Sequence, residues 1–313
     1  MTLLLLDSAS LYFRAFYGVK APMPAPDGTP TNAVRGFLDM VSTLVTRLRP
    51  SDMVACLDQD WRPAWRVALL PTYKTHRLAD QNITPAGGGA PPGEAEPPGL
   101  AEQVPVILDA LAALGIAALG APEHEADDVI ATLAEQATMP VDVVSGDRDL
   151  FQLVDDARAV RVLYTARGVR QLEVVDAAAV KARYGIEPAQ YADFATLRGD
   201  PSDGLPGVPG IGAKTAAGLL TRFGTLDALL EAAAARDRRL AGVAGKLSAA
   251  GDYLTRAPAV VRTVRTLSLP AVDTALPRGP ADAGKLVELE ARWGIGNVLG
   301  RATKALRLQV NGG

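Results

Sequence analysis

Short apolar segments alternate with longer amphipathic ones along the N-terminal half of the chain. Four segments rich in leucine and valine have the length of buried strands: residues 2–6, 53–57, 141–144 and 160–164. The clearest helix is 31–49, where apolar residues recur at i, i+3, i+4 and i+7 until Pro50, and two more are expected at about 102–114 and 126–137. The order strand, helix, strand predicts an α/β fold with a largely parallel central sheet flanked by helices.

The pattern changes at about Tyr184, after which helices alternate with glycine turns. We expect helices at 188–198, 213–223, 225–236, about 246–255 and 284–292. This change predicts an α/β core over residues 1–180 and a mostly helical part over 181–313. Residues 84–99 are rich in Gly and Pro, and a loop of this length inside a domain is typical of a functional or disordered segment.

The composition is that of an ordinary globular chain. It has 313 residues, of which 48% are hydrophobic and 21% charged, enough for one large or two ordinary domains. The single cysteine, Cys56, excludes an intramolecular disulfide and a Cys-rich zinc site and favours a reducing compartment. The apolar start lacks the basic region of an export signal, and no run has the roughly 18 apolar residues of a membrane span. We therefore expect a cytoplasmic protein with no membrane partner.

Acidic residues follow three of the predicted strands directly. Asp7 and Asp58 come after the first two, and the strand at 141–144 leads into Asp147 and Asp149. Because the carboxyl ends of parallel strands meet at one edge of a sheet, we expect these acids to converge. Further acids open the helix at 126–137 and stand at the junction with the helical part: Glu125, Asp127, Asp128, Asp200 and Asp203.

So many carboxylates at one edge would repel one another unless cations held them. An all-oxygen donor set suits Mg²⁺ or Mn²⁺ better than Zn²⁺, and paired metals assist phosphodiester displacement. Taken singly, each acid has a structural alternative as a helix cap, a favourable charge at a helix N-terminus or a turn residue. The joint pattern favours a metal site.

The overall charge of −3 argues at first against a nucleic-acid partner. Setting aside the nine acids above leaves 26 acidic residues against 32 Lys and Arg, a balance of +6. The rest of the chain is therefore basic, and the objection disappears.

The most specific segment is the glycine-rich stretch 205–216. Gly207, Gly210 and Gly212 allow close backbone approach to a ligand, and Gly212 opens a helix whose free amides suit a phosphate, with Lys214 and Thr215 following. The spacing is not that of a P-loop. A helix–hairpin–helix at about 188–223 that grips the backbone of duplex DNA fits better, and a tight interhelical turn is the alternative.

A basic segment lies between the second strand and the Gly/Pro-rich loop. It contains Arg66 and Tyr73, and Lys74 and Arg77 are spaced i, i+3, as on one face of a helix. Such a helix beside the acids would neutralise a scissile phosphate, whereas a solvated basic face is the alternative.

Together these motifs resemble the bacterial 5' nuclease family, which includes the 5'-3' exonuclease domain of DNA polymerase I and its stand-alone flap endonuclease relatives. The resemblance covers about residues 1–270. It is carried, in chain order, by Asp7–Leu11, Arg14–Phe16, Thr31–Ala33, Asp58, Tyr73–Arg77, Glu125–Asp128, Gly146–Leu150 and Gly199–Ala216.

The resemblance implies a PIN-like core, a helical arch at about 72–105 and a helix-three-turn-helix in the C-terminal helical part. It implies a structure-specific, metal-dependent 5' nuclease, both a 5'-3' exonuclease and a 5' flap endonuclease, that hydrolyses DNA at single-strand/duplex junctions in replication and repair. The expected substrate is DNA with a 5' flap, a nick or a 5' end, and the expected state is a monomer.

The resemblance also implies residue roles. All nine acids would hold two or more Mg²⁺ or Mn²⁺ ions, Lys74 and Arg77 would meet the scissile phosphate, and K⁺ would bind at the hairpin. The expected DNA contacts are Arg66, Tyr73, Gly207, Gly210, Gly212, Lys214 and Thr215.

The arch departs from the family, because Glu94 and Glu96 stand where basic residues would help to grip a strand. This departure motivates one alternative, a catalytically weak protein that binds DNA junctions. A second alternative, an RNA-directed nuclease of related architecture, is disfavoured by the hairpin.

Overall fold

A computed structural model describes residues 1–19, 24–79 and 99–308. Its central feature is a single sheet in the order β3-β2-β1-β4-β5-β6, in which all neighbours are parallel except β5 and β6. The strands are β1 (Leu3–Asp7), β2 (Asp52–Leu57), β3 (Ala117–Gly120), β4 (Val141–Ser145), β5 (Val160–Tyr164) and β6 (Glu173–Val175).

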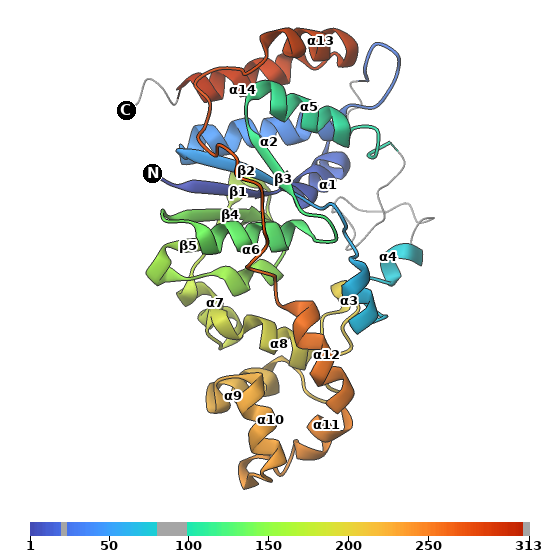
Figure 1. Cartoon of the computed structure of the whole chain (residues 1–313), viewed down its shortest axis with the longest axis vertical. Coiled ribbons are helices and arrows are strands. Elements are labelled where there is room, and N and C mark those ends of the chain that lie inside the picture. Colours follow the sequence, from blue (N-terminus) through green and yellow to red (C-terminus); the bar gives the residue numbers. More distant parts are fainter. Residues whose placement is uncertain (20–23, 80–98, 309–313) are drawn as a thin grey trace.

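Helices cover both faces of this sheet (Figure 1). Before β6 these are α1 (Ser8–Gly18), α2 (Asn32–Leu48), α3 (Ala64–Leu69), α4 (His76–Ala79), α5 (Val104–Leu114) and α6 (Ala126–Gln136). After it come α7 (Ala177–Tyr184), α8 (Tyr191–Arg198), α9 (Ala213–Phe223), α10 (Leu226–Ala234), α11 (Ala244–Ala249), α12 (Gly251–Val261), α13 (Ala283–Trp293) and α14 (Gly296–Leu308).

The alternation of side chains along β1 divides the core into two layers. Leu3 and Leu5 lie in a cluster with residues of α6, α8 and α12, whereas Leu4 and Leu6 lie in a cluster with α1, α2, α5 and α14. Every residue of β1 is buried. A strand buried on both faces explains why its sequence is a continuous run of leucine rather than an apolar and polar alternation.

The four predicted strands are confirmed, and the structure adds two. β3 is short and rich in Ala, and β6 has three residues, of which Glu173 and Val174 are exposed, so neither carried a strong apolar signal. The helix expected at about 246–255 is two helices, α11 and α12, which meet at Ala250 and Gly251. Glycine favours such a break in a helix.

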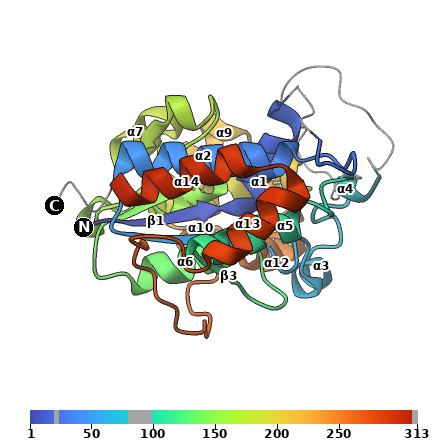
Figure 2. The same cartoon turned by 90° about the horizontal axis from the view of Figure 1, so that it is seen from above.

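The helices after β6 pack in two separate places. Helices α8 to α12 pack against one another, but α13 returns to α5 and α14 to α2, so the C-terminal end of the described chain lies over the helices on one face of the sheet (Figure 2). The division of the chain at about residue 180 stays a prediction. None of the helices in the described ranges is long and apolar enough to span a bilayer.

The strands run so that their carboxyl ends point toward α3 and α4 (Figure 1). The predicted arch at about 72–105 falls here. Its flanks are α4 and the start of α5, while most of it, with the Gly/Pro-rich segment up to residue 98, lies outside the described residues.

Candidate active site

The carboxyl ends of β1 and β2 place Asp7 and Asp58 beside the first turn of α6. Asp7 ends β1 with only 5% of its surface exposed; one of its carboxylate oxygens accepts from the Ser10 amide at 3.0 Å and the other from the Ser145 hydroxyl. Asp58 accepts from the Ala126 amide at 2.6 Å. Two sequence-distant acids are thus fixed by neighbouring parallel strands, as the strand pattern predicted.

The loop after β4 brings Asp147 and Asp149 to the same edge. The Gly146 amide donates to Ser10 Oγ at 3.0 Å, the Asp147 amide to Ser145 Oγ at 2.8 Å and the Asp149 amide to Asp147 Oδ1 at 2.8 Å. A Cβ on Gly146 would lie 2.8 Å from Ser10 Oγ, so glycine is needed for this close approach. The loop is therefore held against the start of α1.

Burial and mutual repulsion perturb these acids strongly. Burial, opposed by the hydrogen bond from Ser145 and reinforced by the charge of Asp58, raises the pKa of Asp7 to about 7. Burial, aided by neighbouring carboxylates, also raises the pKa values of Asp127, Asp147 and Asp149. Negative charge at this edge is thus unfavourable in the protein alone, which is the condition that a bound cation relieves.

The same repulsion connects acids from all five sequence segments. Asp127 repels Asp7 and Asp147, and Asp149 repels residues of the 200–203 turn. Eight of the nine predicted acids take part in this group: Asp7, Asp58, Glu125, Asp127, Asp147, Asp149, Asp200 and Asp203. We call these eight residues the carboxylate cluster.

Glu125 connects the cluster to a buried lysine. Burial raises the pKa of Glu125 to about 7, although Lys74 and Arg66 oppose the shift. Lys74 Nζ lies 2.9 Å from Glu125 Oε2, and the Tyr73 hydroxyl donates to Glu125 Oε1 at 2.8 Å. Burial acts to lower the pKa of Lys74, but the charges of Glu125 and Asp203 outweigh it and raise the pKa above its usual value. Lys74 is therefore a permanent cation, not a proton acceptor.

The predicted basic helix with Lys74 and Arg77 on one face does not form. Lys74 precedes α4 and has φ of 49°, a left-handed backbone, while its amide donates to the Asp203 carbonyl at 3.0 Å. Arg77 instead reaches Asp203 Oδ1 at 3.0 Å. Both cations still lie against the carboxylate cluster, but a turn held by the 200–203 segment places them rather than a helix face.

The 200–203 turn also carries its own ion pair. Arg198 NH2 lies 2.9 Å from Asp200 Oδ2, and the Ser202 amide donates to Asp200 Oδ1 at 3.0 Å. Asp200 is thus a cap of the short 3-10 helix Pro201–Asp203 as well as a neighbour of Asp149. Asp200 therefore has the structural role that was the alternative for it, as a cap of a turn, and also belongs to the carboxylate cluster.

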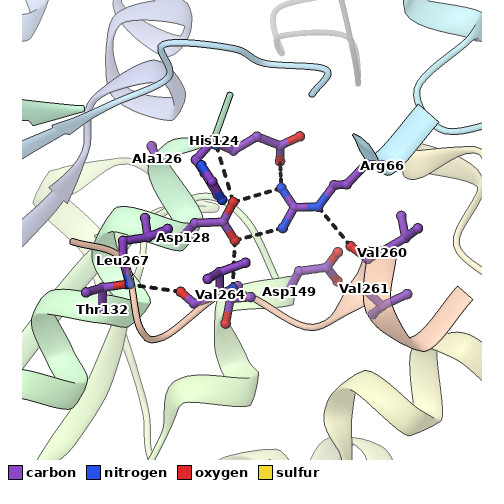
Figure 3. A network of polar contacts seen from close by, with 12 residues as sticks. Arg66, His124, Ala126, Asp128, Thr132, Asp149, Val260, Val261, Val264 and Leu267 are labelled. Atoms are coloured by element: carbon purple, nitrogen blue, oxygen red, sulfur yellow. Dashed lines mark hydrogen bonds and ion pairs between the residues drawn. The ribbon is translucent and has the colours of Figure 1, made fainter. Parts of the chain in front are cut away.

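Asp128 differs from the eight acids of the cluster. It is fully buried, and Arg66 donates to both of its oxygens, at 2.9 and 2.7 Å, while the Val264 amide donates to one of them at 2.8 Å (Figure 3). With both oxygens occupied by protein donors, Asp128 does not fit its predicted role as a metal ligand. The i, i+3 spacing correctly indicated that Glu125 and Asp128 lie together at the start of α6. It did not indicate that Arg66 would donate two hydrogen bonds to Asp128.

Two of the predicted DNA contacts, Arg66 and Tyr73, are buried in the structure and have internal partners. Arg66 is 2% exposed and paired with Asp128, and Tyr73 is 3% exposed and donates to Glu125. Neither side chain is open to a strand of DNA. The guanidinium of Arg66 and the hydroxyl of Tyr73 make hydrogen bonds inside the protein instead.

The donor set of the cluster suits a hard divalent ion, since it consists of carboxylate oxygens without Cys or His. Within residues 1–19, 24–79 and 99–308, no group of three or more Asp, Glu, His or Cys side chains is arranged to hold a metal ion as the side chains stand. Lys74, Arg77 and Arg198 occupy oxygens that a metal would need, and the other acids repel one another. The residues fit divalent metal by donor chemistry, and their side chains must turn toward the ion to ligate it.

The glycine-rich segment forms a tight hairpin between α8 and α9. Gly207 is buried with φ of 67°, and a Cβ there would lie 2.5 Å from the Gly199 amide nitrogen. Gly210 has φ of 76° and accepts at its carbonyl from Lys246 Nζ at 3.0 Å. Gly207 thus closes the hairpin rather than facing outward.

The outer side of the hairpin is open. Gly212 is the N-cap of α9, a Cβ there would meet nothing within 4 Å, and Lys214 and Thr215 in the first turn are exposed. This leaves the amides at the start of an 11-residue helix free beside a lysine. Exposed amides and a lysine are suited to a backbone phosphate, and DNA contact by these three residues stays a prediction.

Sequence reasoning did not select Ser10 and Ser145, although they organise the cluster. Ser145 donates to Asp7 and accepts from the Asp147 amide, so one hydroxyl joins β1 to the loop after β4. The sequence feature that could have identified Ser145 is its position, because it is the last residue of the buried strand β4 and comes directly before the acidic loop. The segment 260–264, which contacts Arg66 and Asp128, gave no such signal.

Comparison with known proteins gives consistent results over the whole chain. The model of a 5'-3' exonuclease N-terminal resolvase-like domain matches residues 2–185, and that of a 5'-3' exonuclease C-terminal SAM fold matches residues 186–283. A 5'-3' exonuclease of Streptomyces coelicolor is 56% identical over 304 residues, which are 97% of this chain and 99% of that protein.

A DNA polymerase I of Mycobacterium bovis is 43% identical over 234 residues, covering 74% of this chain but 24% of the polymerase. Among solved structures, a bacteriophage T5 flap endonuclease in complex with DNA and metal ions has a TM-score of 0.64. That alignment covers 99% of this chain and 100% of the phage protein at 18% identity, which is a likeness of fold.

Proposed function

The chain belongs to the 5'-3' exonuclease family, and from this we propose a structure-specific, metal-dependent 5' nuclease that hydrolyses DNA at single-strand/duplex junctions. Its activity as a 5'-3' exonuclease follows from membership; cutting at 5' flaps is our extension. The observation that carries the proposal is the carboxylate cluster, in which buried and half-buried acids from five segments gather at one edge of the sheet.

We assign metal binding to the cluster, with Asp7, Asp58, Asp127, Asp147 and Asp149 as the ligands of two or more Mg²⁺ or Mn²⁺ ions. Asp200, Asp203 and Glu125 border this set and complete its negative charge. Bound metals supply an activated water and stabilise charge on the reacting phosphate. A K⁺ ion on the hairpin backbone belongs to the same proposal.

Lys74 and Arg77 would bind the scissile phosphate. Lys74 contacts Glu125 and Arg77 contacts Asp203, so both cations lie beside the proposed metal ligands. A metal ion that drew one of these carboxylates away would leave the paired Lys or Arg able to bind a phosphate. The left-handed backbone at Lys74 supports this role, because such conformations often hold functional side chains.

The hairpin would hold the duplex beside the reacting strand. Gly210, Gly212, Lys214 and Thr215 present backbone amides and one cation, which contact phosphates without reading bases. Affinity for DNA is then expected to fall steeply with salt and to depend little on sequence. The same chemistry suits a 5' end, a nick or a flap.

The setting of the activity rests on the relatives. Similarity to DNA polymerase I favours a role in replication and repair, and an enzyme of chromosomal DNA would work in the cytoplasm of a bacterium. The monomeric state stays a prediction.

The test is cleavage of duplexes with a 5'-labelled flap, in DNA and in RNA of one geometry, with Mg²⁺ or Mn²⁺ and with EDTA. We expect cutting of the DNA flap at the junction in either metal and none in EDTA. Tight junction binding without cutting in both metals would contradict the proposal and favour a binding protein. Preferential cutting of the RNA flap would replace DNA by RNA as the substrate.

A further inference from the structure

Arg66 and Asp128 form a buried ion pair between two elements that are far apart in sequence. Arg66 lies on α3 and Asp128 in the first turn of α6, and their two hydrogen bonds of 2.9 and 2.7 Å join the planar guanidinium to both carboxylate oxygens (Figure 3). Burial acts to lower the pKa of Arg66, but the bonds to Asp128 and the charge of Glu125 raise it. Arg66 is therefore a permanent cation.

The pair also binds residues 260–264, which contain the end of α12 and the residues that follow it. Arg66 Nε donates to the carbonyl of Val260 at 3.1 Å, and the Val264 amide donates to Asp128 Oδ1 at 2.8 Å. Thr132 Oγ1, one turn further along α6, donates to the Val264 carbonyl at 3.2 Å. The C-terminal end of α12 is thus bonded to α3, and the segment that follows it is bonded to α6.

Helix α12 is in turn bonded to the helices that carry the hairpin. Tyr253 donates to the Thr196 carbonyl of α8 at 2.9 Å. Just after α12, Arg262 lies 2.8 Å from Asp193 of α8, whose other oxygen accepts from the Leu226 amide at the start of α10 at 2.8 Å. The position of α8, which leads into the hairpin, is therefore coupled to α12.

On its other side the pair adjoins the carboxylate cluster. Asp128 follows Asp127 directly, and Arg66 NH1 lies 3.7 Å from Glu125 Oε2. Asp127 and Glu125 share the beginning of α6 with Asp128. A displacement of Asp128 moves both cluster acids with it, because they lie on the same helical turn.

We propose that Arg66 and Asp128 are a positioning pair, which couples the placement of the hairpin-bearing helices to the alignment of the proposed metal ligand Asp127 and of Glu125 beside it. Neither residue touches DNA or metal in this account. The pair acts through α12 on one side and through the first turn of α6 on the other. The inference rests on the proposed function, since it concerns the metals of that site.

Two variants separate positioning from simple stabilisation. Arg66→Lys keeps the charge but cannot bond both oxygens of Asp128 and the Val260 carbonyl together. The double variant Arg66→Met with Asp128→Leu removes the buried charges as a pair, a replacement that often preserves stability, and also removes the bonds to Val260 and Val264. Arg161→Lys is the control for the loss of a two-bond pair alone, because the half-exposed Arg161 makes such a pair with Asp142 between β4 and β5, away from α12.

Each protein is measured for melting temperature, DNA affinity in EDTA, single-turnover cleavage and the Mg²⁺ concentration at half-maximal rate. For both test variants we expect DNA affinity within about threefold of the wild type, cleavage at least about tenfold slower and a half-maximal Mg²⁺ concentration raised severalfold. The control should match the wild type in all four. A structural pair alone would lower the melting temperature without moving the Mg²⁺ requirement.

A folded double variant with wild-type rate and Mg²⁺ dependence would overturn the proposal. So would loss of folding in both variants, or a loss of DNA affinity as large as the loss of rate, because the pair would then be purely structural or part of the DNA grip. If the wild type itself does not cleave in Mg²⁺ or Mn²⁺, the proposed function fails instead.

Discussion

The carboxylate cluster and the glycine hairpin solve opposite physical problems. The cluster collects like charges in a buried place, and burial with mutual repulsion raises the pKa values of Asp7, Asp127, Asp147 and Asp149. The hairpin relies on backbone: Gly207 and Gly210 have positive φ, and Gly212 to Thr215 are exposed. One region depends on side-chain charge and the other on backbone shape.

The difference implies that catalysis and binding can be lost separately. Changing an acid of the cluster should remove chemistry and leave the DNA grip, because the hairpin makes no use of that charge. Changing the hairpin should weaken binding and leave the chemistry of bound DNA.

The largest effect is expected for Asp149→Asn. This change keeps the shape of the side chain but removes a charge from the centre of the proposed metal ligands, so cleavage should fall by about 10³-fold or more. DNA affinity should stay the same or increase, since one negative charge is gone. Single-turnover cleavage and a binding titration in EDTA measure the two quantities. A retained rate would remove Asp149 from the site.

Gly207→Ala should damage the hairpin and spare the cluster. The added Cβ would lie 2.5 Å from the Gly199 amide nitrogen, at a φ of 67°, so the backbone of the hairpin must shift. We expect DNA affinity about tenfold weaker and a lower melting temperature, with the cleavage rate of saturated enzyme within a few-fold of wild type.

Gly218→Ala on the open side of α9 is the control for this change. A Cβ there meets nothing within 4 Å, and alanine favours helix, so stability should hold or rise. If Gly207→Ala binds and cleaves like this control, the hairpin does not depend on its backbone shape.

Lys214→Ala should have a smaller effect, confined to binding. Removing one phosphate-contacting cation is expected to weaken DNA affinity by about three- to tenfold and to reduce the slope of log affinity against log salt by about one. Lys285 on α13, at the opposite end of the molecule from α9 (Figure 1), is the charge-matched control. An unchanged salt slope would exclude Lys214 from the DNA interface.

The smallest effect concerns stability without DNA. The pKa values of Asp7 and Glu125 are raised to about 7 in the folded, metal-free protein. Their protonation therefore stabilises the fold fully below about pH 4, the range of unfolded carboxyl groups, and this contribution is lost as pH rises through 7. In EDTA the melting temperature should drop by a few degrees between pH 6 and 8, and Mg²⁺ should reverse the drop at pH 8. A Mg²⁺-independent melting temperature would argue against metal in the cluster.

Much of the cluster could be predicted from sequence because strand direction is visible there. A run of buried apolar residues ending in Asp7, and another leading to Asp147 and Asp149, fixes where these acids lie once the strands are parallel. The hairpin was visible for a similar local reason, since closely spaced glycines mark positive φ.

The roles of neighbouring residues could not be predicted in this way. Asp127 and Asp128 are adjacent acids in one helical turn, yet one joins the cluster and the other binds Arg66. About 100° of helix rotation separates them, and which side meets an arginine from α3 depends on packing. For the same reason the sequence showed that Arg66 is basic but not that it is buried.

The most direct test of the central claim is one experiment on one flap duplex, in which binding in EDTA and single-turnover cleavage in Mg²⁺ are measured for three proteins. We expect that the wild type binds and cuts at the junction and that Asp147→Asn binds with wild-type affinity but does not cut. Lys214→Ala should bind more weakly but cut at nearly the wild-type rate when saturated. Loss of binding in Asp147→Asn together with loss of chemistry in saturated Lys214→Ala would contradict the separation of cluster and hairpin.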